Sequence, residues 1–145
     1  MKLFKFGVLP LVLAAASVGA SAAEVVVTAG ARDFQPAMEE GSTYGLVRAQ
    51  PGDTIVFKNM VGGHNTHSVA IPEGAQDWSS ELGKDFHVSL EKPGAYVYIC
   101  QPHESMGMAG VILVGDGKPA NLDALAKSAN ATAKRMGKKI SKLFP

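Results

Sequence analysis

The sequence has no excess of charge of either sign. It contains 14 Lys and Arg against 13 Asp and Glu over 145 residues, a formal net charge of +1. Nucleic-acid-binding domains usually carry a strongly basic patch or stripe, so this composition does not indicate that class and we expect no nucleic-acid partner. The cations are unevenly placed, because seven of them follow residue 117 together with a single acid, Asp123. A solvated helix face explains such a basic tail.

Long apolar runs are also missing, apart from a short one near the N-terminus. Residues 6–18 are largely apolar, Lys2 and Lys5 precede them, and Ala20-Ser21-Ala22 follows. This order of a positive start, an apolar centre and small residues before a cleavage site is typical of a secretory signal peptide. The apolar centre is shorter than the roughly 20 residues of a membrane span. The sequence therefore predicts a signal peptide over residues 1–23, cleaved after Ala22 or Ala23. It predicts a periplasmic protein with no membrane insertion of the remainder.

Cysteine is nearly absent as well. Cys100 is the only cysteine in the chain, so no internal disulfide can form. An exported protein meets an oxidising compartment, in which an exposed thiol reacts. A lone thiol in that setting is buried, paired with another chain or bound to a metal. The cysteine count alone leaves these three outcomes open.

The chain contains instead a series of short apolar runs, rich in β-branched and aromatic residues and separated by turn residues. Strands are predicted over residues 24–28, 54–57, 67–71, 85–90, 95–99 and 110–114, with residues 44–49 as a further edge strand. Residues 85–90 alternate, which predicts that Phe86, Val88 and Leu90 face inward. About seven strands in so short a span indicate an all-β fold, a two-sheet Greek-key β-sandwich. We expect residues 31–42 to form a loop.

Two C-terminal α-helices are expected beyond Asp116. Asn121 is a suitable N-cap for the first helix, and residues 132–143 form the second. The apolar residues expected on their packed faces are Leu122, Leu125, Ala126, Ala129, Met136, Ile140 and Leu143. The predicted organisation is one domain over residues 24–145, with residues 120–145 as a helical appendix that packs on the sandwich.

Candidate metal ligands gather in one short segment near the end of the sandwich. Cys100, His103, Met106 and Met108 lie within it, and His64 lies upstream at the start of another predicted strand. Blue-copper sites use two imidazoles and a thiolate in a plane, with a weak thioether on the axis. Such a set suits both Cu(I), which prefers sulfur, and Cu(II), which prefers nitrogen, so little moves when an electron transfers. The residue types therefore favour copper.

Two other interpretations use the same residues. A structural zinc site usually has four strong ligands, often with paired cysteines, whereas this chain has one cysteine. A catalytic Cys–His pair needs an oxyanion hole and a third, orienting group, and the sequence has no motif for either. We therefore predict no catalytic residues and an electron-transfer protein rather than an enzyme. His67 and His87 are expected to be polar strand residues rather than ligands.

At these residues the sequence resembles the cupredoxin family, and in particular its pseudoazurin branch. The resemblance runs over most of the mature chain, and the order and spacing of its pieces make it specific. The pieces are Pro51-Gly52-Asp53-Thr54, Gly63-His64-Asn65, Ile71-Pro72-Glu73-Gly74-Ala75, Pro93-Gly94-Ala95-Tyr96, Cys100-Gln101-Pro102-His103, Val114-Gly115-Asp116 and Asn121-Leu122-Asp123. The resemblance implies a cupredoxin-like sandwich.

The resemblance also implies one copper ion with His64, Cys100 and His103 as equatorial ligands. Met108, eight residues after the cysteine, matches the pseudoazurin and plastocyanin spacing, whereas Met106, six residues after it, matches the shorter loop of amicyanin. The two C-terminal helices are a pseudoazurin feature that amicyanin lacks. Met108 is therefore the favoured axial ligand.

Supporting roles follow from the same resemblance. Asn65 would link the two ligand loops and offer its backbone N–H to the Cys100 sulfur. The exposed edge of His103 would be the electron exit. The apolar patch around that exit would consist of Pro102, Met106 and Ala109.

The implied function is single-electron transport by an exported type 1 (blue) copper protein that cycles between Cu(I) and Cu(II). Its implied partners are periplasmic redox proteins, either a reductase such as nitrite reductase or a c-type cytochrome, and we expect a monomer. One departure from the family is Glu104 beside His103, because pseudoazurins tend to ring this patch with lysines; this leaves the identity of the partner open. A copper carrier or storage protein is the alternative, since Met106 and Met108 with a histidine also suit Cu(I) delivery.

Overall fold

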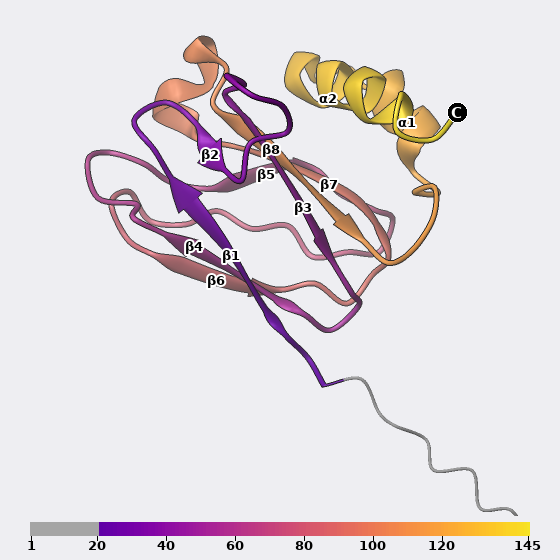
Figure 1. Ribbon diagram of the computed structural model, residues 1–145, viewed down its shortest axis with the longest axis horizontal. Helices are drawn as coiled ribbons and strands as arrows, with labels where there is room; N and C mark the ends of the chain where they lie inside the picture. Colours follow the sequence, from indigo (N-terminus) through magenta and orange to yellow (C-terminus); the bar gives the residue numbers. More distant parts are fainter. Residues whose placement is uncertain (1–20) are drawn as a thin grey trace, which may run out of the picture.

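The computed structural model describes residues 21–145, and its strands form two sheets that face each other (Figure 1). One sheet has the order β2-β1-β4-β6 and the other β3-β8-β7-β5. The strands are β1 Glu24–Ala29, β2 Phe34–Gln35, β3 Tyr44–Ala49, β4 Thr54–Lys58, β5 His67–Ala70, β6 Phe86–Ser89, β7 Gly94–Ile99 and β8 Ala109–Val114. The predicted signal peptide lies outside the described residues except for its last three. Within residues 21–145 no helix has the length and apolar character needed to cross a bilayer.

The predicted all-β sandwich is confirmed, and both of its sheets are mixed. β1 runs parallel to β4 and β3 runs parallel to β8, whereas the remaining pairs are antiparallel. One prediction was wrong, because the expected loop over residues 31–42 contains strand β2. Phe34 is fully buried there, and it pairs with Ala29 of β1. A strand of two residues is too short to show the alternation by which strands are recognised.

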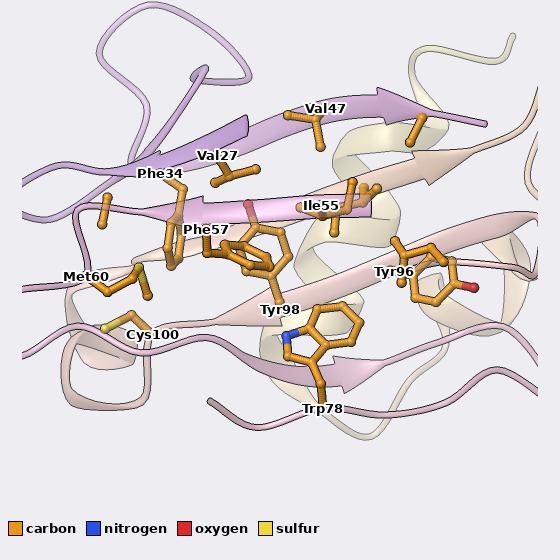
Figure 2. Close-up of a cluster of buried hydrophobic side chains, with 14 of the residues drawn as sticks. Val27, Phe34, Val47, Ile55, Phe57, Met60, Trp78, Tyr96, Tyr98 and Cys100 are labelled. Atoms are coloured by element: carbon orange, nitrogen blue, oxygen red, sulfur yellow. The ribbon is translucent and has the colours of Figure 1, made fainter. Parts of the chain in front are cut away.

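Aromatic rings fill the space between the sheets (Figure 2). The ring of Tyr98 meets those of Phe34 and Phe57 edge-on, with centroids 4.9 Å and 5.1 Å away. Such edge-to-face pairs add to the hydrophobic gain from burying the rings. Met60 and Cys100 lie at one end of this cluster and Tyr96 at the other (Figure 2). The lone cysteine is thus buried at one end of the sandwich.

Strands β7 and β8 are buried on both faces, because two helices cover the side turned away from the other sheet. The helices are α1, Leu122–Ala126, and α2, Ala131–Ser141. A second core forms between these helices and the sheet. Its fully or almost fully buried members are Ala95, Val97, Val111, Leu113, Leu122, Leu125, Ala133, Met136 and Ile140. The prediction of two helices packed on the sandwich is confirmed.

The details of the helix ends differ from the prediction. Asn121 stands at the start of α1, but its side chain makes no capping bond. Its Oδ1 accepts from Ala95 N–H at 2.9 Å and its Nδ2 donates to Ala95 C=O at 2.8 Å, so it links the helix to β7. The first helix also ends at Ala126, which leaves Ala129 outside it and exposed. Leu143, expected on the packed face, is 45% exposed because α2 ends at Ser141.

Two glycines allow close approaches that a larger residue would block. A Cβ at Gly110 would collide with the ring and hydroxyl of Tyr98. A Cβ at Gly137 would lie 2.6 Å from the backbone nitrogen of Ala126 and 2.7 Å from the carbonyl carbon of Leu125. These contacts fix how Tyr98 crosses β8 and how closely α2 lies against α1.

Candidate metal centre

Two loops at the Cys100 end of the sandwich carry the predicted site residues. His64 lies between β4 and β5, in a loop where Gly62 and Gly63 have φ values of 90° and 88°. Cys100 follows β7 directly, and His103 lies in the 3₁₀ helix Gln101–Met106. Positive φ favours glycine, so the glycine pair lets the first loop turn sharply before His64.

The antiparallel pairing of β7 and β8 closes the second loop at its base. Ile99 pairs with Ala109. Just beyond this pair, Cys100 N–H donates to Met108 C=O at 3.1 Å, and Met108 N–H donates to His103 C=O at 3.2 Å. Backbone hydrogen bonds therefore close the loop, and Cys100 and Met108 lie opposite each other across its base.

Three donor atoms meet where these loops come together. Cys100 Sγ lies 3.7 Å from His64 Nδ1 and 3.3 Å from His103 Nδ1. The ligand atoms of the three residues all lie within 4.8 Å of one another, a spacing that could hold one ion. The two imidazole rings are 4.7 Å apart between centroids. Three of the four predicted ligands are thus brought together.

The donors differ in their exposure to solvent. Cys100 is fully buried, His64 is 6% exposed and His103 is intermediate. Burial lowers the pKa of the His64 imidazole, and the charge of nearby His103 lowers it further. A low pKa keeps His64 neutral, the form in which imidazole binds a metal.

Met106 and Met108 lie in different environments. Met108 is fully buried and belongs to the same core cluster as Cys100 and Met60. Met106, in contrast, is 44% exposed. Burial in the cluster that contains Cys100 thus distinguishes the Met108 thioether from the exposed thioether of Met106.

Asn65 ties the two loops together. Its Nδ2 donates to Gln101 Oε1 at 2.7 Å, and its Oδ1 accepts from Gln101 N–H at 2.9 Å. The predicted link between the ligand loops is confirmed, and it joins the neighbour of His64 to the neighbour of Cys100. The bond from the Asn65 backbone to the Cys100 sulfur stays a prediction. The Gln101 side chain was missed, since nothing in the sequence indicates which group Asn65 would meet.

Two further contacts hold the outer side of the ligand loop, and neither was predicted. Thr132 Oγ1, at the start of α2, donates to Glu104 Oε1 at 3.1 Å. Thr43 Oγ1 donates to Gly107 C=O at 3.2 Å. These bonds connect residues far apart in sequence, which no local pattern reveals.

Exposed apolar side chains lie on both ligand loops, and they include Pro102 and Met106 of the predicted patch. Ala109 was expected in an exposed patch and is 1% exposed, because it is the first residue of β8. Val61, three residues before His64, is 67% exposed. Leu82, at 59% exposure, lies next to Gly83, whose N–H donates to His64 C=O at 2.8 Å. An apolar residue beside the turn-forming Gly62 is the signal that could have identified Val61.

The other histidines do not join the cluster. His67 opens strand β5, and its Nδ1 is buried without a hydrogen-bond partner among the described residues. His87 is exposed on β6. Within residues 21–145 the metal-binding group consists of His64, Cys100 and His103, with no further His, Cys, Asp or Glu.

The chain is similar to known copper proteins. Residues 23–115 match the family of copper binding proteins described as the plastocyanin/azurin family. The pseudoazurin of Paracoccus pantotrophus is 38% identical over 72% of this chain and 67% of its own length. A solved pseudoazurin from Sinorhizobium is 36% identical, with a TM-score of 0.65 over 81% of this chain and 96% of its own. The pseudoazurin structure from Methylobacterium extorquens AM1 is 30% identical, with a TM-score of 0.65 over 83% and 98%.

Proposed function

We propose that this chain binds its single copper ion through His64, Cys100, His103 and Met108 and carries single electrons in the periplasm. The chain belongs to the plastocyanin/azurin family of copper-binding proteins and, within it, to the pseudoazurins. The observation that carries the ligand assignment is the convergence of two imidazole nitrogens on one buried sulfur, at 3.7 Å and 3.3 Å.

The donor set fits copper better than zinc. Two imidazoles, one thiolate and a thioether are the ligands of blue-copper sites. A structural zinc site takes four strong ligands, and the described part of the chain offers only the three in this group. Bound here, copper supplies a one-electron couple between Cu(I) and Cu(II).

Met108 is proposed as the fourth ligand, because its burial beside Cys100 supports this role. The backbone bonds that join it to Cys100 and His103 hold it at the base of the ligand loop. Met106 is 44% exposed and is proposed to lie outside the site.

The work of the protein is to hold these donors in place and to exclude water. Asn65 and Gln101 fix the two loops relative to each other, and Thr132 and Thr43 hold the outer side of the ligand loop. Because the donors are held by the fold, they need to move little when the charge at the site changes, which favours fast electron transfer. Partly buried His103 is proposed as the route by which an electron enters and leaves.

The apolar side chains of Val61, Leu82 and Met106 are proposed as the contact surface for redox partners. Exposed apolar patches mark interaction sites, and weak redox encounters use small ones. The proposed partners are periplasmic, either a reductase such as nitrite reductase or a c-type cytochrome. Export is proposed from the signal-peptide pattern over residues 1–23.

The test compares spectra of the copper-loaded protein and three variants. We expect intense visible absorption from thiolate-to-copper charge transfer in the native protein, and its loss in Cys100→Ser. Met108→Ala should change the absorption and the reduction potential, whereas Met106→Ala, the matched control, should leave both unchanged. A colourless Cu(II) protein would refute the copper site, and an effect of Met106→Ala in place of Met108→Ala would refute the axial ligand.

A chelator separates electron transfer from copper delivery. The buried donors should retain copper for hours in the presence of a competing chelator, as expected of a carrier of electrons. Loss of the blue colour within minutes from the native protein would instead favour the copper-carrier alternative.

A further inference from the structure

The last residue of the predicted signal peptide is built into the folded domain. Ala23 N–H donates to Asp53 Oδ1 at 2.8 Å, and Ala23 C=O accepts from Thr54 N–H at 2.9 Å. The next residue, Glu24, pairs with Thr54 in the parallel ladder of β1 and β4. Ala23 therefore extends this ladder by one residue and contacts the carboxylate at the start of β4.

Asp53 is an unusual partner, because it is a buried acid without a cation. It is 6% exposed, and its Oδ2 accepts from Gln50 N–H at 2.7 Å. The backbone N–H groups of Gln50 and Ala23 hold the pKa of this carboxyl below its usual value, so it is ionised. No Lys, Arg or His lies within ion-pair distance of it in the part of the chain that the structure describes. Buried carboxylates are almost always paired with a positive charge.

We propose that export leaves Ala23 as the first residue of the mature protein, and that its α-ammonium forms an ion pair with Asp53. This rests on the proposed export. In the processing step water adds across the Ala22–Ala23 peptide bond and leaves a carboxylate on Ala22 and an ammonium on Ala23. The same nitrogen that donates to Asp53 as an amide then carries the positive charge that the carboxylate lacks. Ala23 is exposed, so the ammonium is also reached by water.

Cleavage one residue later would give a different molecule. Both cuts leave small residues before the scissile bond, Ala20 and Ala22 in one case and Ser21 and Ala23 in the other. Removal of Ala23 would eliminate two hydrogen bonds, the one that its N–H donates to Asp53 Oδ1 and the one that its C=O accepts from Thr54 N–H. Loss of two such bonds lowers the folding equilibrium constant by about tenfold or more. The two cuts, which the sequence leaves equal, would thus give mature chains of different stability.

The first experiment determines the start of the mature chain. The full chain is expressed in a Gram-negative host, the protein is purified from the periplasm, and its intact mass and N-terminal sequence are measured together with its visible spectrum. We expect a chain that begins at Ala23. A chain that begins at Glu24, at another residue or at Met1 overturns the proposal. The blue colour of the same sample reports on the copper site separately, so failure of one proposal does not imply failure of the other.

The second experiment tests the ion pair on the same exported protein. The rate at which the α-amine reacts with an amine-selective reagent is followed against pH. We expect the pKa of the α-ammonium to lie above its usual value of about 8, with labelling at pH 8 at least threefold slower than in Asp53→Asn. Asp77→Asn, which removes an exposed acid from a loop, is the matched control and should label like the native protein. An α-amine that titrates at its usual value in the native protein overturns the ion pair, whether or not Asp53→Asn folds.

Discussion

Replacing Asn65 by Ala should destabilise the protein in a way that can be calculated from two hydrogen bonds. The substitution removes both bonds to Gln101, of 2.7 Å and 2.9 Å, at a position only 5% exposed. A hydrogen bond contributes about 1 kcal/mol net to the free energy of unfolding, so we expect a loss of about 2 kcal/mol. For a domain of this size that corresponds to a melting temperature lower by roughly 8 °C. Gln101 is exposed, so water can reach its freed groups, which argues against a larger loss.

The matched control is Gln101→Ala, which removes only the bond between the two side chains. The Gln101 backbone N–H remains and still donates to Asn65 Oδ1. We therefore expect about half the effect, or about 1 kcal/mol. The double variant should be no less stable than Asn65→Ala alone, because Asn65→Ala has already removed the bond between the two side chains. Such non-additivity is typical of residues that share an interaction.

Urea unfolding of the copper-free protein is the suitable assay. Bound metal stabilises a folded state by mass action. Without copper, the difference in free energy of unfolding between variants reports on the hydrogen bonds between the loops. Trp78, 6% exposed in the core, is the only tryptophan and serves as the fluorescent probe. Equal destabilisation by Asn65→Ala and Gln101→Ala, or additive destabilisation in the double variant, would refute the account of Asn65 as a link between the loops.

Four further predictions concern packing and protonation. Gly110→Ala should destabilise the fold by about 1–3 kcal/mol in thermal unfolding, because its Cβ would collide with Tyr98; Tyr98→Phe, which removes a buried hydroxyl with no partner in the described residues, should be neutral or stabilising. Gly137→Ala should also destabilise the fold, because the new Cβ would collide with the backbone of α1. This is the opposite of the usual effect, since Ala stabilises a helix by about 1 kcal/mol relative to Gly. An increase in melting temperature would contradict the prediction. Folding lowers the pKa of His64 below its usual 6.5, so the unfolded chain binds more protons than the folded one. The copper-free protein should therefore lose stability as the pH falls below about 6.5. Urea unfolding at several pH values measures this dependence of the free energy of unfolding on pH, and the same dependence in a His64→Gln variant would contradict the prediction.

Much of the fold could be predicted because its strands are regular and its turns contain Gly and Pro. Phe86, Val88 and Leu90 alternate, and all three pack against the core between the sheets. Strand β2 and the role of Asn121 could not be predicted, because they depend on partners distant in sequence. Asn121 suits a helix cap, but the two bonds that it makes to Ala95 occupy its side chain.

The gathering of three candidate ligands could be predicted for a different reason. Cys100, His103 and Met108 lie in a single loop, so their sequence spacing limits how far apart they can lie. His64 was a candidate from its position at the start of another predicted strand, but only the resemblance to a family assigned it to the same site, since no spacing rule relates residues in separate loops. The burial that separates Met108 from Met106, and the exposure of Val61 and Leu82, depend on the packing of the whole domain.

The unequal exposure of the two imidazoles limits how the protein can work. Within the described chain, His64 and Cys100 are sealed behind the loops, and His103 alone among the three clustered donors is partly open to solvent. If electrons pass through His103 as proposed, the protein that donates an electron and the protein that accepts it bind in turn to the same surface. The dissociation rate of the first partner then limits turnover, which favours short-lived complexes over tight ones.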